Sequence, residues 1–160
     1  TVPILVLPDE TVIDESLAIM IWSLKRFSHV NKQTHKWLDK SIYEPSIKLV
    51  QQNDIDFKPL LDKYKYCTEQ GAVVHHRENA EWFLSLLNDS LEQCFYLLGD
   101  ELTLADIATF PFIRQFALVD YDWFLNSRYK ALVRWLRYLL TLDCFNRVML
   151  KQVVFRSAIG

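Results

Sequence analysis

The residues near the N-terminus combine a hydroxyl, a carboxylate and the start of an expected helix. Glu15 and Ser16 precede an apolar pattern of helical spacing from Leu17 to Leu24, so Ser16 falls in the first helical turn. Unpaired amides at a helix N-terminus bind anions, and a carboxylate offers a place for an ammonium group. With Val2-Pro3, these groups suit the α-amino acid end of a small ligand. The structural alternative makes Ser16 an ordinary first-turn residue and Glu15 a complement to the helix dipole.

Thr103, followed three residues later by Asp106, predicts a capping box in its acidic form at a helix start. In such a box the hydroxyl accepts from the Asp106 amide, and the carboxylate accepts from the Thr103 amide. Leu102 and Ile107 stand at the positions of a hydrophobic staple. We expect a folding role for this pair and no catalytic role.

The adjacent histidines His75 and His76 suggest a metal site at first sight. Neighbouring residues on a helix point about 100° apart, so both cannot easily serve one ion. His75 and Glu78 have i, i+3 spacing, but the sequence lacks the second such pair of a di-metal bundle. We therefore expect a solvated helix face and no metal.

The sequence has only three glycines, Gly71, Gly99 and Gly160. A nucleotide-binding loop needs two or three glycines within about eight residues, so P-loop and Rossmann proteins are excluded. No GxSxG or HExxH signature is present either. Scarce glycine also argues against many tight turns. A helix-dominated fold is the first expectation.

The length of 160 residues suits one domain, or a domain with a small attachment. Eighteen Lys and Arg against 20 Asp and Glu give a net charge of −2, so we expect no nucleic-acid partner. Apolar runs such as Leu17 to Trp22 are far shorter than the ~18 residues of a membrane span. The N-terminus lacks the basic region of a signal peptide. We expect no membrane association and a cytoplasmic location.

The cysteines Cys67, Cys94 and Cys144 form no CxxC pair and are odd in number. This pattern is typical of reduced thiols in a cytosolic protein, and we expect them to be mostly buried.

The first residues predict a β-hairpin. An apolar run from Pro3 to Leu7 and the pair Val12-Ile13 flank the turn signal Pro8 to Thr11. A helix follows, with Asp14 as its expected N-cap. Because an isolated hairpin is marginally stable, and because no initiator Met is present, we expect further strands upstream of Thr1 in a longer chain.

From Gln33 onward the apolar spacing predicts four to six helices. The expected segments are Lys36 to Gln52, Phe57 to Tyr66, Val73 to Leu91, Thr103 to Phe116, Tyr129 to Leu142 and Cys144 to Val154. Pro45 is expected to kink or restart the first of them. The segment from Thr103 is very apolar and should lie centrally.

Two stretches resemble the glutathione S-transferase family. Residues 1–9 and 14–19 are similar to the second half of its thioredoxin-like domain. Residues 102–108 and 110–116 resemble the hallmark helix of its C-terminal helical domain, and residues 53–66 resemble a bacterial branch. The stretches occur in the family's order, and the similarity runs through nearly the whole chain.

The resemblance implies roles for individual residues. Pro3 would be the family's cis-proline, turning the backbone of Val2 towards the cysteinyl part of glutathione. Ser16 and its amide would hold the γ-glutamyl carboxylate, with Glu15 near the amino group. The catalytic residue that stabilises the thiolate lies in a strand–helix unit expected before Thr1, so no catalytic residue is assigned. The chain alone should therefore bind glutathione weakly or undetectably.

The prediction for the fold is mainly α: an all-helical glutathione S-transferase C-terminal domain, 33–160, preceded by a β-hairpin and helix of a thioredoxin-like domain, 1–27. The implied function is glutathione binding and its transfer to, or thiol exchange with, a hydrophobic electrophile. Tyr64 or Phe112 would line the electrophile pocket, and family members commonly form homodimers. The alternative function is a non-catalytic helical module that acts through protein contacts.

Overall fold

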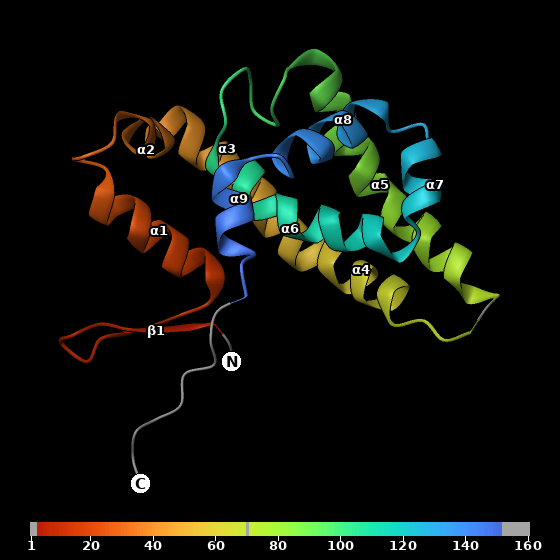
Figure 1. Ribbon diagram of the computed structural model, residues 1–160, viewed down its shortest axis with the longest axis horizontal. Helices are drawn as coiled ribbons and strands as arrows, with labels where there is room; N and C mark the ends of the chain where they lie inside the picture. Colours follow the sequence, from red (N-terminus) through yellow and green to blue (C-terminus); the bar gives the residue numbers. More distant parts are fainter. Residues whose placement is uncertain (1–2, 70, 152–160) are drawn as a thin grey trace, which may run out of the picture.

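The computed structural model describes residues 3–69 and 71–151, and this part of the chain is mainly helical with one small hairpin (Figure 1). The hairpin and helix α1 lie on one side of the molecule, and the helices from α3 onward form a packed body beside them. This arrangement is the mainly α class expected from the sequence.

The hairpin joins strands β1 (Ile4–Val6) and β2 (Val12–Asp14) in antiparallel register, with Leu5 opposite Ile13. The turn between them closes with a hydrogen bond from the Leu7 amide to the Thr11 carbonyl, 2.9 Å. Leu5 and Ile13 are half-buried, whereas the opposite face of both strands is exposed. The predicted hairpin is thus present, with one face towards α1 and one towards solvent.

Helix α1 (Ser16–Phe27) has Glu15, and not Asp14, as its N-cap residue. The prediction for Asp14 is wrong because this residue still belongs to β2, where it pairs with Ile4. Helix α2 (Lys32–Trp37) follows, capped by Asn31, whose side chain accepts from the amides of the next turn. No residue of β1, β2, α1 or α2 is buried.

The next segment is an almost continuous helical rod of three parts: α3 (Lys40–Gln52), the π-helical turn η1 (Asn53–Phe57) and α4 (Lys58–Lys65). The single helix predicted from Lys36 is instead divided between α2 and α3, because the chain leaves helical hydrogen bonding near Leu38. Pro45 lies inside α3, so it neither starts nor ends the helix.

Five helices complete the described chain: α5 (Ala72–Gln93), α6 (Leu104–Val119), α7 (Tyr121–Asn126), α8 (Lys130–Leu139) and α9 (Asp143–Val148). Helix α7 was not predicted, since its six residues span less than two turns. Helix α9 ends well before the predicted Val154, which lies outside the described residues.

The core lies between α4, α5, α6 and α8, with α6 at its centre. Helix α6 packs against α3, α4, α7 and α8, and nine of its residues are buried, whereas the face with Pro111 and Leu118 is exposed. The aromatic side chains Phe57 and Phe83 stack with ring centroids 4.6 Å apart, and Tyr64 lies 4.9 Å from Phe116. Each fully buried side chain of this kind contributes about 1.5–3 kcal/mol to folding.

A capping box begins α6. The Asp106 carboxylate of this box also accepts hydrogen bonds from groups outside the helix. The Asp106 Oδ2 atom accepts from the amide and the hydroxyl of Thr103, at 2.9 and 2.8 Å. The Oδ1 atom accepts from the Leu97 amide and from the Trp135 indole, both at 2.9 Å. One buried side chain therefore ties the loop before α6 to its first turn and to α8.

Burial raises the pKa of Asp106 above the usual aspartate value, although its hydrogen bonds oppose the shift. Asp106 has no exposed surface, so the charged form depends on those donors. A replacement that removes one acceptor oxygen leaves a buried donor unpaired.

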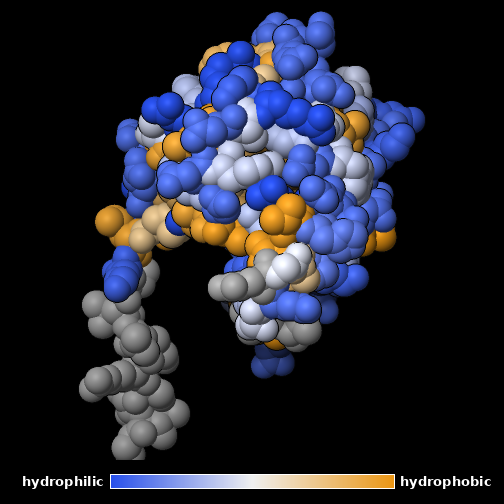
Figure 2. Space-filling model, turned by 90° about the vertical axis from the view of Figure 1, so that its right-hand side faces the viewer, coloured by the Kyte–Doolittle hydropathy of each residue, from blue (hydrophilic) through white to orange (hydrophobic). Residues whose placement is uncertain are grey.

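The surface has a hollow on one side, and apolar side chains gather along its edge (Figure 2). Large apolar residues are also exposed in the hairpin, where Ile4, Val6 and Val12 have exposed fractions of 53%, 61% and 60%. Among residues 3–69 and 71–151, no helix is long and apolar enough to cross a membrane.

Replacing Asp106 with Asn should lower the free energy of unfolding by about 2–4 kcal/mol, because an amide NH2 would face a buried donor. Urea denaturation gives this value directly. The matched control is Asp100→Asn, an exposed carboxylate in the same loop, which should change stability by less than about 0.5 kcal/mol. Equal effects of the two variants would contradict the role assigned to Asp106.

Candidate functional site

The sequence-predicted ligand residues meet where β2 passes into α1. Strand pairing brings Ile4 opposite Asp14, so Pro3 and Glu15 each adjoin a paired position at the same end of the hairpin. Pro3, Glu15 and Ser16 are all exposed. Val2 lies outside the described residues. The structure thus brings three of the four predicted residues to one accessible place.

Glu15 has an unusual backbone conformation, with φ 66° and ψ 137°. A side chain at positive φ is crowded against its own backbone, and such a conformation costs about 1–3 kcal/mol. The strand and the helix on either side hold it there. This sharp bend sets the direction of α1 away from β2.

The first turn of α1 presents amides that the helix does not use. The first hydrogen bond runs from the Ile19 amide to the Glu15 carbonyl, 3.1 Å, so the amides of residues 16–18 precede the helical ladder. The first turn has no acidic residue, and no side chain caps it. A helix of 12 residues with an uncapped, exposed start attracts an anion.

This place can bind a zwitterion. A carboxylate would accept from the free amides and from the Ser16 hydroxyl, while the Glu15 carboxylate can receive an ammonium group. The donors and the acceptor are adjacent in sequence and exposed.

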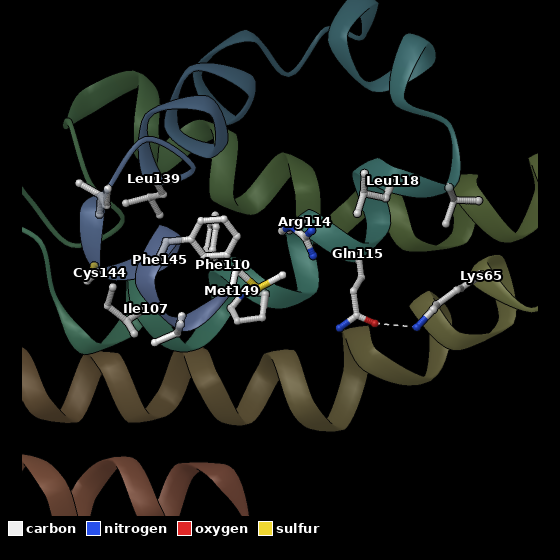
Figure 3. A pocket seen from close by; sticks show the side chains of 14 residues that line it. Lys65, Ile107, Phe110, Arg114, Gln115, Leu118, Leu139, Cys144, Phe145 and Met149 are labelled. Carbon is white, nitrogen blue, oxygen red and sulfur yellow. Dashed lines mark hydrogen bonds between the residues drawn. The ribbon is translucent and has the colours of Figure 1, made fainter. Parts of the chain in front are cut away.

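Neither aromatic residue predicted for an electrophile pocket is among the described residues that line the apolar cavity between α6 and α9. The side chain of Tyr64 is buried in the core, and burial raises the pKa of its hydroxyl. Phe112 is half-buried, with the Lys58 amine 6.0 Å from its ring centre. This cavity has a volume of about 920 Å³ (Figure 3). Spacing alone did not reveal it, because its walls come from helices far apart in the sequence.

A second polar cluster ties α5 to α7 and α8. The Tyr129 hydroxyl donates to Glu81 at 2.7 Å, and burial raises its pKa. The Arg77 guanidinium lies 4.2 Å from the Trp123 ring centre and 3.5 Å from the Glu81 carboxylate. These contacts link the three helices through one ion pair and one hydrogen bond, although the buried Arg77 Nε atom has no hydrogen-bond partner, and we assign the cluster a structural role.

The structure shows the predicted exposure of His75 but not the predicted burial of the cysteines. His75 is exposed on α5, as expected, and accepts or donates a 3.0 Å hydrogen bond with Asn79. The described residues contain no group of three potential metal ligands. All three cysteines are free, but the expectation of burial is wrong: Cys67 and Cys94 are half-buried and Cys144 is exposed.

Comparison with solved structures shows the fold. A glutathione S-transferase-I solved with lactoylglutathione is similar over 92% of this chain and 73% of its own, with TM-score 0.75 and 18% identity. A Gtt2-class glutathione S-transferase of Vibrio parahaemolyticus matches over 90% and 70%, with TM-score 0.71 and 20% identity. A glutathione transferase of Phanerochaete chrysosporium, solved with oxidized glutathione, matches over 88% and 67%, with TM-score 0.72 and 16% identity.

Comparison of sequences finds similarity over a shorter part of the chain than comparison of structures does. No curated protein matches this chain. Residues 71–137 match the family model of the glutathione S-transferase C-terminal domain. This match covers α5, α6, α7 and most of α8, including the Asp106 capping box. Residues 71–137 are therefore similar to the glutathione S-transferase C-terminal domain, in a chain that has the glutathione S-transferase fold.

Proposed function

We propose that this chain provides the γ-glutamyl side of a glutathione site, at the start of α1. The site would serve transfer of glutathione to a hydrophobic electrophile, or thiol exchange with one. The observation that carries the proposal is the exposed, uncapped start of α1 beside Glu15. Support comes from two similar glutathione transferase structures, one solved in complex with oxidized glutathione and the other with two glutathione molecules bound.

The geometry of the bend supports a specific set of proposed ligand contacts. The γ-glutamyl carboxylate would accept from the first amides of α1 and from the Ser16 hydroxyl, and its ammonium group would donate to Glu15. The resemblance adds Pro3 as a cis-proline and the backbone of Val2 as partner of the cysteinyl part. Each charge-assisted hydrogen bond in such a site contributes about 1.5–3 kcal/mol.

The chemical step needs a group that stabilises the thiolate, because the thiolate is the nucleophile. The resemblance assigns that group to a strand–helix unit that precedes the hairpin in the family. We propose no catalytic residue in this sequence. The 160-residue chain by itself should then bind glutathione weakly and not turn it over.

The division into two domains belongs to the same proposal. Residues 1–27 would be the end of a thioredoxin-like domain, and residues 33–160 the helical domain. We also place the protein in the cytoplasm as a homodimer. The exposed apolar face of the hairpin, with Ile4, Val6 and Val12, gives specific support to self-association. It also supports the second candidate function, a non-catalytic interaction module.

Titration with reduced glutathione tests the site. The amide NMR signals of residues 15–18 should shift with a dissociation constant of about 1 mM or weaker, which corresponds to about −4 kcal/mol. Ser16→Ala should weaken binding several-fold, whereas Ser23→Ala, further along α1, should not. Shifts that are absent at about ten times that concentration, or equal effects of both variants, would contradict the proposed site.

Replacing Glu15 with Gly separates backbone strain from ligand binding. Glycine tolerates positive φ, so α1 should gain about 1 kcal/mol of local stability over the Glu15→Ala variant. Amide hydrogen exchange in α1 measures this difference. Both variants should lose glutathione binding, since both lack the carboxylate. Greater protection in Glu15→Ala would argue against strain at this position.

The hairpin surface predicts concentration-dependent association. Val6→Lys should shift sedimentation velocity profiles towards monomer. A charge on an exposed strand opposes the pairing of its edge with a second chain and the packing of its apolar face against one. Val30→Lys provides the control, since Val30 is 73% exposed but lies outside the hairpin. A wild-type chain that stays monomeric at about millimolar concentration would count against the proposal.

A further inference from the structure

The α1–α2 turn, residues 25–32, combines positive charge with exposed apolar side chains. Residues 16–38 contain four Lys or Arg and no Asp or Glu, although the whole chain has a net charge of −2. The side chains of Phe27 and Val30 have exposed fractions of 56% and 73%. In Figure 1 the turn lies at the left of the view and projects away from the packed body that begins at α3. The turn is therefore a protruding surface with one sign of charge.

Three of the four cations are free to meet a partner. Lys25 and Arg26 are exposed in the last turn of α1, and Lys32 is exposed at the start of α2. None of these three forms an ion pair with the part of the chain that the structure describes. The fourth cation, Lys36, lies 3.0 Å from the Glu101 carboxylate, which neutralises its charge.

Hydrogen bonds of the backbone hold the turn in its projecting form. The amides of Val30 and Asn31 donate to the Phe27 carbonyl at 3.0 and 3.2 Å. The Asn31 side chain caps α2 and accepts from the amides of Gln33 and Thr34 at 2.9 and 3.3 Å. Because these local bonds close the turn, Phe27 and Val30 stay at the surface without packing against the core.

The helix dipole explains only part of this pattern. Lys25 and Arg26 complement the negative end of α1, but the dipole gives no reason for apolar side chains among the cations. Single exposed apolar residues are common on proteins. One of them here is Ile55, which is 71% exposed and lies between Asp54 and Asp56. The α1–α2 turn differs because its apolar side chains lie among cations.

We propose that the α1–α2 turn docks on a bilayer that contains anionic phospholipids. Lys25, Arg26 and Lys32 pair with the lipid headgroups, and Phe27 and Val30 enter the boundary between headgroups and acyl chains. Apolar side chains prefer this boundary to water, and each cation near an anionic leaflet adds attraction. A soluble polyanion would pair with the cations but would offer no apolar layer to the other two side chains.

This contact is peripheral and needs no helix that crosses the membrane. The expectation of no membrane association rests on the length of the apolar runs, which decides whether a chain spans a bilayer and not whether its surface binds one. The turn includes none of Val2, Pro3, Glu15 and Ser16. The inference therefore goes beyond the proposed glutathione chemistry and does not depend on it.

Vesicle flotation with the whole chain tests the proposal. The vesicles consist of phosphatidylcholine alone, or of phosphatidylcholine mixed with phosphatidylserine. The chain should bind the mixed vesicles at least about tenfold more tightly, because each cation near an anionic leaflet adds about fivefold. Binding should weaken when salt rises from about 0.1 M to about 1 M, since the screening length falls from about 10 Å to about 3 Å.

Two pairs of variants separate the charge from the apolar contact. Arg26→Gln should weaken binding to the mixed vesicles about fivefold. Lys63→Gln, which removes an exposed cation of α4, should have no effect. Val30→Ser should weaken binding at least about threefold, whereas Ile55→Ser should not. All four side chains are exposed, so the variants should fold.

Three results would overturn the proposal. The first is equal binding to the two kinds of vesicle, or no binding to either. The second is an effect of Lys63→Gln or Ile55→Ser as large as that of its partner variant. The third is binding to polyglutamate or to an oligonucleotide that Val30→Ser leaves unchanged, in a chain that does not float with vesicles. The turn would then bind a soluble polyanion. Failure of the glutathione titration would leave the flotation results unchanged, so the two proposals fail separately.

Discussion

The buried carboxylate of Asp106 is the interaction on which the helical body depends. Four donors from the loop before α6, the first turn of α6 and the side chain of Trp135 converge on its two oxygens. Burial raises the pKa of this group, so its charge is acceptable only because every oxygen is paired. The carboxylate thereby fixes where α6 begins. Helix α6 in turn lies at the centre of the core and lines one side of the apolar cavity.

The apolar cavity and the start of α1 differ in how they are held. One side of the cavity is built on α6 and α8, which pack against one another in the core, and the other side is α9, which has no buried residue. The start of α1 rests on a hairpin and two helices that have no buried residue. Its geometry comes from local backbone constraints, chiefly the positive φ of Glu15 and the hydrogen-bonded pairing of β1 with β2. We therefore expect the start of α1 to be more responsive to ligands and to neighbouring protein surfaces than the cavity.

Local signals in the sequence predicted much of the fold. The turn from Pro8, the capping pair Thr103 and Asp106, and the long apolar stripe of α5 all lie where the residue pattern placed them. The failures also have physical causes. Asp14 is an excellent N-cap by type, but strand pairing with Ile4 retains it in β2 and moves the cap to Glu15. Tyr64 is a plausible pocket residue by type, but the packing of α4 on α6 buries it.

The sequence by itself determined the helical class, the start of α6, and the presence of a carboxylate and a hydroxyl next to each other where α1 begins, since these depend on neighbours within a few residues. Tertiary structure decided which side chains from distant parts of the sequence meet. Trp135 reaches Asp106 across 29 positions, and Arg114 of α6 meets Phe145 of α9. Which side chains share a cavity depends on how helices distant in sequence pack, and apolar periodicity shows only that a face is buried, not what it is buried against.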